Sequence, residues 1–350
     1  MHADAADLAA CASLIRCGSR TFHAASLLLP RRVRQPAYAL YAFCRLADDS
    51  VDLDGATDTL DGLRERLARA YAGAPYPIAA DRALADVVAH FAIPRALPEA
   101  LFEGFAWDAA GRRYEDLTDL RAYATRVAGS VGAMMAILMG VRDDIAIACA
   151  CDLGIAMQLS NIARDVGEDA RAGRLYLPLR WLREAGIDPD EWMTRPEFGP
   201  RIAAVVERLL AAADWHYAQA DAGIALLPAA CRPSIAAARV LYAEIGREVV
   251  RRNHDSVSAR AFVPARRKAW LLARTLFVQS AAIIAAQAPV RAVPLTEESR
   301  FLVEAVRATQ HSAAVDFGRD GLGGLDRQVA WLVDLFVRLD QQQHMERQEQ

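Results

Sequence analysis

The segment 36–52 (PAYALYAFCRLADDSVD) carries polar side chains at helical intervals within an otherwise apolar stretch. Steps of four, three and four residues separate them, so they share one face of a helix. Because most other positions are apolar, the pattern is typical of a mostly buried helix with one polar stripe. Such a stripe must face a partner or a cavity. The polar positions are Tyr41, Arg45, Asp48 and Asp52.

The segment 158–169 (QLSNIARDVGED) repeats this arrangement, with polar side chains at steps of three, four and four. If the two helices face one another, four carboxylates point into one apolar cavity. Two like charges about 4 Å apart repel by roughly 4 kcal/mol at an effective dielectric near 20, and divalent cations would remove that repulsion. The polar positions of this second stripe are Gln158, Asn161, Asp165 and Asp169.

The kind of ligand in the two stripes indicates which metal they would hold. Oxygen ligands without a Cys/His cluster favour Mg²⁺ or Mn²⁺, and Mg²⁺ completes its shell with water and substrate phosphates. The sequence therefore predicts a diphosphate substrate. Either stripe alone could be a solvated helix end. Two such stripes on apolar helices, with Arg45 and Arg164 on or beside them, favour a metal site.

The same residues resemble a known family. Segments 41–52 and 158–178 resemble the two aspartate-rich signatures of the squalene/phytoene synthase family, most closely its bacterial phytoene-forming members. The resemblance covers roughly residues 8 to 290 and includes GSRTFHAASLLLP near the start and LYAEIGREVVRRNHDSVSARAFVP late in the chain. It implies the all-α isoprenoid synthase fold, a single domain with a central cavity between facing helices.

The resemblance also implies an activity. Two geranylgeranyl diphosphates would be joined head to head, through prephytoene diphosphate, to give phytoene and release both diphosphates. This prenyl transfer would use Mg²⁺ or Mn²⁺ and no nicotinamide cofactor. The proposed domain boundaries are a catalytic isoprenoid synthase domain over residues 1–290 and a helical extension with a disordered tail over 291–350.

Site residues follow from the resemblance and the stripes together. The metal ligands would be Asp48, Asp52, Asn161, Asp165 and Asp169. The substrate contacts would be Ser19, Arg20, Thr21, Phe22, Tyr41, Arg45, Gln158, Arg164, Tyr242 and Arg260. The expected catalytic residues are Asp48, Asp52, Asp165, Asp169, Arg45 and Tyr41. Without the resemblance, Ser19 could simply cap a helix, Tyr242 could be a core residue and Arg260 a surface residue.

An apolar slot is expected beside the diphosphate site. In segment 127–141 (VAGSVGAMMAILMGV) small residues recur on one helix face, which permits either close helix packing or a tunnel for an isoprenoid tail. Small residues at Ala25 and Ser26, about one turn after Phe22, favour a slot deep enough for the longer tail.

Composition excludes several other classes of protein. The net charge of −3 gives no general attraction for nucleic acid. Six cysteines without a CxxC pair indicate reduced, buried thiols in a cytoplasmic protein. The start, MHADAADLAA, lacks the basic residues of a secretion signal. No apolar run reaches the roughly 20 residues that span a bilayer, so any membrane contact would be peripheral.

The rest of the sequence predicts helices that support the fold and carry no site residues other than those named above. A loop carrying Arg31, Arg32 and Arg34 is expected before Pro36. In the extension, an apolar face that includes Leu325 and Leu339 could pack on the domain or lie on a membrane. The expected helices are 4–17, 60–71, 83–91, 97–110, 146–171, 199–223, 233–253 and 264–286.

Three rival functions stay open. A squalene or dehydrosqualene synthase would share the first half-reaction but use farnesyl diphosphate, and squalene formation would also need a nicotinamide reductant. A noncatalytic assembly protein on the same fold should tolerate loss of the acidic stripes, yet both stripes are intact. A class I terpene cyclase would use metals and diphosphate, but the paired motifs resemble head-to-head synthases more closely.

Overall fold

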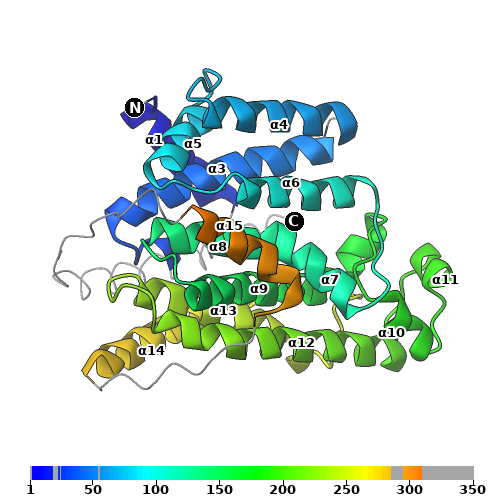
Figure 1. The fold of residues 1–350 in the computed structure, drawn as a ribbon. Coiled ribbons are helices and arrows are strands. Elements are labelled where there is room, and N and C mark those ends of the chain that lie inside the picture. Colours follow the sequence, from blue (N-terminus) through cyan, green and yellow to red (C-terminus); the bar gives the residue numbers. More distant parts are fainter. Residues whose placement is uncertain (1, 19–22, 24, 54–55, 285–294, 310–350) are drawn as a thin grey trace, which may run out of the picture.

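The computed structural model describes residues 2–18, 23, 25–53, 56–284 and 295–309 (Figure 1). Side-chain positions are described for these residues except 18, 48–53, 56–59, 276 and 278–284. Throughout the described ranges the chain forms helices joined by turns and short loops, without a strand. The expected all-α fold is therefore confirmed.

The helices follow the labels of Figure 1. They are α1 (Ala5–Gly18), α3 (Arg31–Leu53), α4 (Ala56–Tyr71), α5 (Ala79–His90), α6 (Ala96–Ala109), α7 (Leu117–Ala124), α8 (Ser130–Leu138), α9 (Asp144–Arg171), α10 (Leu179–Glu184), α11 (Pro189–Thr194), α12 (Pro200–Ile224), α13 (Arg232–Arg251), α14 (Ala265–Ile284) and α15 (Arg300–Ala308). A π-helical turn, η1 (Thr125–Gly129), joins α7 to α8, and a 3₁₀ turn, η2 (Glu297–Ser299), precedes α15.

Helix α9 lies at the centre of the fold. In Figure 1 the helices α1, α3, α4 and α5 lie above it, and α12, α13 and α14 lie below it. The Asp143 carboxylate caps its start by accepting from the amides of Ile145 and Ala146, and Gly173, with φ +79°, follows its end. Its apolar part is long enough to cross a membrane, but 67% of that window is buried inside the fold. It is therefore the core helix.

Two glycines let the backbones of neighbouring helices touch at α9. A Cβ added to Gly132 of α8 would lie 2.1 Å from the carbonyl oxygen of Ala150, and one added to Gly154 would lie 2.2 Å from that of Ala128. Neither position has room for a side chain. Gly132 thus serves close helix packing, and together with Ala128 it also lines the cavity described below, so both expected alternatives apply to segment 127–141.

Two apolar cores meet beside this contact. One core joins α1, α3–α6 and α8 to the first part of α9, and the other joins α7, α10, α12 and α13 to the later part of α9. Val127, in the π-helical turn, packs against both. π-Helical turns occur often at functional sites, because the wider turn changes the direction of the side chains that follow.

The structure corrects two expectations about the first hundred residues. Arg31, Arg32 and Arg34 do not lie in a loop; they form the first turns of α3, which continues through Pro36. The Pro30 carbonyl accepts from the amides of Val33 and Arg34 at 2.9 Å, so the helix is already established before Pro36, and that proline removes only one bond. Helices α4 and α5 likewise begin earlier than expected, at Ala56 instead of residue 60 and at Ala79 instead of residue 83.

The cysteines differ in part from their expected burial. All six are free thiols, but Cys17 is exposed and Cys44 is half-buried. Burial raises the pKa of Cys11 and of Cys231 to about 11 and that of Cys149 to about 12. The buried thiols are therefore unreactive at neutral pH.

Helix α15 packs back on the body of the fold. Leu302, Val303 and Val306 are buried in the first apolar core, and Arg307 pairs with Asp144 at the start of α9. The apolar face expected over residues 325–339 lies outside the described residues.

Candidate active site

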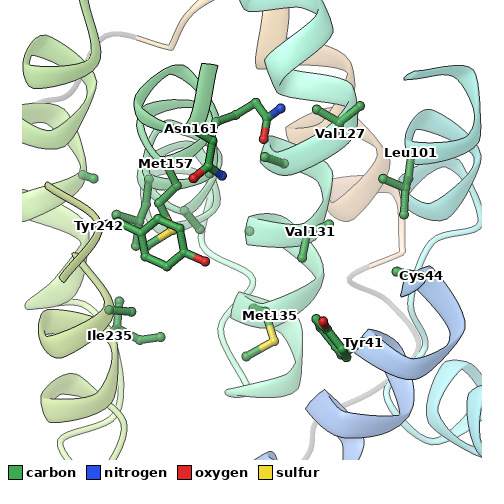
Figure 2. Close-up of a pocket in the computed structure, with 18 of the residues that line it drawn as sticks. Tyr41, Cys44, Leu101, Val127, Val131, Met135, Met157, Asn161, Ile235 and Tyr242 are labelled. Atoms are coloured by element: carbon green, nitrogen blue, oxygen red, sulfur yellow. The ribbon is translucent and has the colours of Figure 1, made fainter. Parts of the chain in front are cut away.

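One cavity of about 640 Å³ lies between α3, α6, η1, α8, α9, α12 and α13. Figure 2 shows Tyr41 of α3, Met135 of α8, and Asn161 of α9 around the same space, with Ile235 and Tyr242 of α13 opposite. The two helices that carry the polar stripes, α3 and α9, therefore line one cavity, as expected.

The lining along α9 changes from apolar to polar. It begins at Ala146 and ends at Asp169, a distance of about 35 Å at the α-helical rise per residue. The lining positions up to Met157 are apolar or small. From Gln158 onward they are mainly polar: Gln158, Asn161, Arg164, Asp165 and Asp169.

Helix α3 shows the same change in the same direction. Ala37 and Leu40 line the cavity near the start of the helix, and Tyr41 and Arg45 follow. The helix continues to Leu53, so helical spacing puts positions 48 and 52, the predicted ligands Asp48 and Asp52, on the face of Arg45. Their side chains lie outside the described residues, as does the segment of Ser19, Arg20, Thr21 and Phe22.

Asp165 is held between two guanidinium groups. Arg164 forms two hydrogen bonds to it, at 2.7 and 2.6 Å, and Nε of Arg260 lies 2.9 Å from its Oδ1. Arg260 also reaches Glu168 at 3.3 Å. Arg260 does not line the cavity itself, but it meets a predicted metal ligand at the edge of the polar end.

A glycine in the second motif permits this contact. A Cβ at Gly167 would lie 2.1 Å from the carbonyl oxygen of Val257, and the Gly167 amide donates to the carbonyl of Ser256 at 3.0 Å. The loop that carries Arg260 therefore lies directly against α9. A larger residue at position 167 would push this loop away.

The oxygen atoms at the polar end suit a hard cation. Burial, with the charge of Asp165, raises the pKa of Asp169 to about 7. Oδ1 of Asn161 is buried in the wall and accepts no hydrogen bond from any described residue. Among the described side chains no three His, Cys, Asp or Glu residues gather into a metal site. Helix α9 supplies two carboxylates and an amide, so Asp48 and Asp52 of α3 would have to complete the set.

The sequence analysis missed a half-buried acid, Asp108, that also lines the cavity. The Asp108 carboxylate of α6 accepts hydrogen bonds from the hydroxyls of Tyr123, at 2.7 Å, and Tyr176, at 2.8 Å. The two tyrosine rings stack with centroids 5.3 Å apart. Burial raises the pKa of both phenols, so they stay protonated and donate. A sequence signal existed, because Leu101, Phe105 and Asp108 are spaced four and three residues apart.

Four further residues differ in whether they line the cavity. Tyr242 lines the cavity from α13, as the resemblance implied, and Arg174 lines it from the loop after α9. Ala25 and Ser26 do not line it, although they were expected to deepen the slot. Both are buried, and the Ser26 hydroxyl lies 3.1 Å from the Tyr38 hydroxyl, so these small residues serve packing instead.

The apolar part of the cavity is made by several helices around the first half of α9. Gly223 of α12 approaches α9 so closely that a Cβ there would lie 2.2 Å from that of Cys149. We call this part the apolar slot; it is lined by Val131, Met135, Met139, Cys149, Leu153, Met157, Leu227 and Ile235. The cavity thus combines an oxygen-rich polar end with a long apolar slot.

Comparison with known proteins identifies relatives over most of the chain. The squalene/phytoene synthase family profile matches residues 15–269. A phytoene synthase of Rhodobacter capsulatus is 51% identical over 311 residues, covering 87% of this chain and 92% of that protein. One of Cereibacter sphaeroides is 54% identical over 278 residues, covering 76% and 78%.

Solved structures agree on the fold. A dehydrosqualene synthase crystal structure superposes with a TM-score of 0.72 at 32% identity, covering 79% of this chain and 97% of that chain. A squalene synthase from Alicyclobacillus acidocaldarius superposes with a TM-score of 0.66 at 26% identity, covering 71% and 95%. The helices around the cavity are therefore arranged as in these enzymes.

Proposed function

The chain belongs to the squalene/phytoene synthase family, and we propose that it is a phytoene synthase. It would join two geranylgeranyl diphosphates head to head, through prephytoene diphosphate, and release two diphosphates. The observation that supports this proposal best is the continuous cavity, whose polar end adjoins the apolar slot along a single helix, α9.

The polar end would hold the diphosphates. Asn161, Asp165 and Asp169, with Asp48 and Asp52, would bind Mg²⁺ or Mn²⁺, which when bound stabilises the negative charge of the leaving diphosphate. Arg45 and Arg164 would contact the phosphate oxygens directly, with Tyr41 and Gln158 as hydrogen-bond donors. Since these groups are fixed before the substrate ionises, little rearrangement is needed during the reaction.

The apolar slot would hold the isoprenoid tails. Burial of each CH₂ contributes about 0.8 kcal/mol, so a twenty-carbon chain supplies ample binding energy to fix its orientation. The same walls exclude water from the carbocation that ionisation leaves. No protein nucleophile is required, and the final proton would leave to bound diphosphate.

One incubation tests the proposal. Purified protein is mixed with Mg²⁺ or Mn²⁺ and either geranylgeranyl or farnesyl diphosphate, with and without NADPH, and the hydrocarbon is identified by mass spectrometry. We expect phytoene from geranylgeranyl diphosphate without NADPH. A product from farnesyl diphosphate alone would contradict the assignment of the tail length.

A dehydrosqualene synthase is the second candidate, because a solved structure of that activity superposes on this chain at 32% identity. It would give a thirty-carbon hydrocarbon in the same incubation. Two relatives that are 51% and 54% identical to this chain over the aligned residues are named phytoene synthases, which favours the first candidate.

A further inference from the structure

Helix α14 exposes large aromatic side chains on its outer face. Trp270 is 49% exposed and Phe277 is 79% exposed. Arg266 and Arg274 are exposed on the same face, because residues 266, 270, 274 and 277 follow one another at steps of four, four and three. We call these four residues the α14 outer face.

The opposite face fixes the helix to the protein. Leu271 and Leu272 are buried against Ala237 and Leu241 of α13. Arg267 donates to the buried Glu244 carboxylate at 2.9 Å. The orientation of α14 is therefore set by packing and by an ion pair, and the exposure of Trp270 follows from that orientation.

The region around the outer face is basic in an otherwise weakly acidic chain. The α14 sequence ARRKAWLLARTLFVQSAAII contains four Arg or Lys residues and no Asp or Glu. The whole chain, by contrast, has a net charge of −3. Arginine side chains also lie over the Trp270 ring, with Arg267 at 4.7 Å and Arg274 at 5.4 Å from its centroid.

The outer face is separated from the cavity by one helix. Ile235, Ala238 and Tyr242 of α13 line the cavity, whereas Ala237 and Leu241 of the same helix pack with α14. A surface that attaches the protein to lipid here would bring the apolar slot close to the membrane.

We propose that the α14 outer face docks on a bilayer that contains anionic lipid. Trp and Phe on one helix face, flanked by Arg and Lys, are typical of helices that lie in the membrane interface. The aromatic rings would enter the boundary between headgroups and acyl chains, and the arginines would contact lipid phosphates. The absence of acidic residues from α14 matches the negative charge of such a surface.

Vesicle flotation of the full-length protein tests this proposal. One set of vesicles is phosphatidylcholine alone, and the other also contains phosphatidylglycerol. We expect binding to the anionic vesicles and weaker binding as salt is added. The double variant Trp270→Ser/Phe277→Ser should lower the vesicle affinity by more than about tenfold, since burying one large apolar side chain already contributes about that factor.

Two further variants test the role of the arginine charges and the specificity of the α14 outer face. Arg266→Gln/Arg274→Gln should remove most of the preference for anionic vesicles. Ile78→Ser/Phe198→Ser is the matched control, because these side chains are exposed to 41% and 37% on other elements, and it should bind like the wild type. All variants are made in the full chain, so residues 310–350 contribute equally to each. Circular dichroism and turnover in detergent should be unchanged throughout.

Three results would overturn the proposal. The first is that the wild type binds neither kind of vesicle. The second is that Trp270→Ser/Phe277→Ser floats like the wild type. The third is that this variant converts a dimer to a monomer in light scattering while vesicle binding is unchanged, which would make the outer face an interface between two copies of the chain.

Discussion

Arg260 and Asp165 form an ion pair between a loop and the core helix, with Nε 2.9 Å from Oδ1. The pair brings a positive charge to a carboxylate that the proposed function gives to a metal ion. The guanidinium therefore offsets the negative charge of the polar end while no metal is bound. When a diphosphate and metal are bound, we expect this guanidinium, at the edge of the polar end, to contact phosphate oxygens.

Gly167→Ala tests how this pair is positioned. The added Cβ would meet the Val257 carbonyl at 2.1 Å, so the loop must move away from α9 and Arg260 with it. We expect KM for the diphosphate substrate to rise about tenfold, because the charge-assisted hydrogen bond expected from Arg260 to a phosphate oxygen is lost or lengthened. Arg260→Gln should give a similar rise.

Gly62→Ala is the control for that substitution. No heavy atom lies within 4 Å of a Cβ at Gly62, and alanine favours helix over glycine. This variant should leave KM unchanged and slightly raise the thermal midpoint. If Gly167→Ala behaved like Gly62→Ala in steady-state kinetics, the loop contact would have no role in substrate binding.

Asp165→Ala and Asp48→Ala should each abolish turnover while leaving the fold intact. Both carboxylates are proposed metal ligands, and removing electrostatic stabilisation of a leaving group typically costs at least about a hundredfold in rate. Asp144→Ala, at the exposed start of the same helix as Asp165, is the control. Hydrocarbon formation is measured with circular dichroism in parallel. Near-normal activity of Asp165→Ala would count against the metal assignment.

The pKa of Asp169 predicts how stability changes with pH in the metal-free protein. Burial and the Asp165 charge raise this pKa from 3.8 to about 7, so the folded state binds more protons than the unfolded state between these values. The contribution of Asp169 to the free energy of unfolding is thus fully present below 3.8, its pKa in the unfolded chain. This contribution is lost as the pH rises through about 7, its pKa in the folded protein.

Asp169→Asn should remove that loss. Urea unfolding in EDTA, measured at about pH 5 and about pH 8, should show a larger fall in stability for the wild type than for the variant. Asp144→Asn should follow the wild type. Equal falls in wild type and Asp169→Asn would mean that this carboxyl is ionised in the folded protein at neutral pH.

The helical period of the sequence predicted α9 and its stripe well. Gln158, Asn161, Asp165 and Asp169 all line the cavity, since the period of an isolated helix determines which residues share a face. The start of α3 at Arg31 was missed, because a proline such as Pro36 usually disfavours helix. Here the Pro30 carbonyl accepts the first hydrogen bonds of the helix, so α3 has already begun when the chain reaches Pro36.

Contacts between segments that are distant in the sequence could not be predicted from local sequence patterns. Asp108 meets Tyr123 and Tyr176 only when α6, α7 and the loop after α9 converge. Ala25 and Ser26 show the converse error. Their small size suggested a deep slot, but small residues also permit close packing, and only the tertiary structure distinguishes the two.

Asp108 and the two tyrosines that donate to it, Tyr123 and Tyr176, give a prediction about kcat rather than KM. The Asp108 carboxylate fixes the stacked rings of Tyr123 and Tyr176, both of which line the cavity. Ring faces stabilise a nearby cation by about 1–2 kcal/mol when desolvated, and this stabilisation appears only after the substrate ionises. Tyr176→Phe frees the ring from Asp108, so we expect kcat to fall about tenfold with KM nearly unchanged.

Tyr71→Phe is the matched control for Tyr176→Phe, because the Tyr71 hydroxyl donates to the carbonyl of Ile93 at 3.1 Å away from the cavity wall. It should lower stability slightly, by about 1 kcal/mol, and leave both kinetic constants unchanged. Steady-state kinetics at saturating metal distinguish the outcomes. A rise in KM with kcat unchanged for Tyr176→Phe would place the phenol on the diphosphate rather than beside the carbocation, because a contact made equally in the ground and transition states changes only KM.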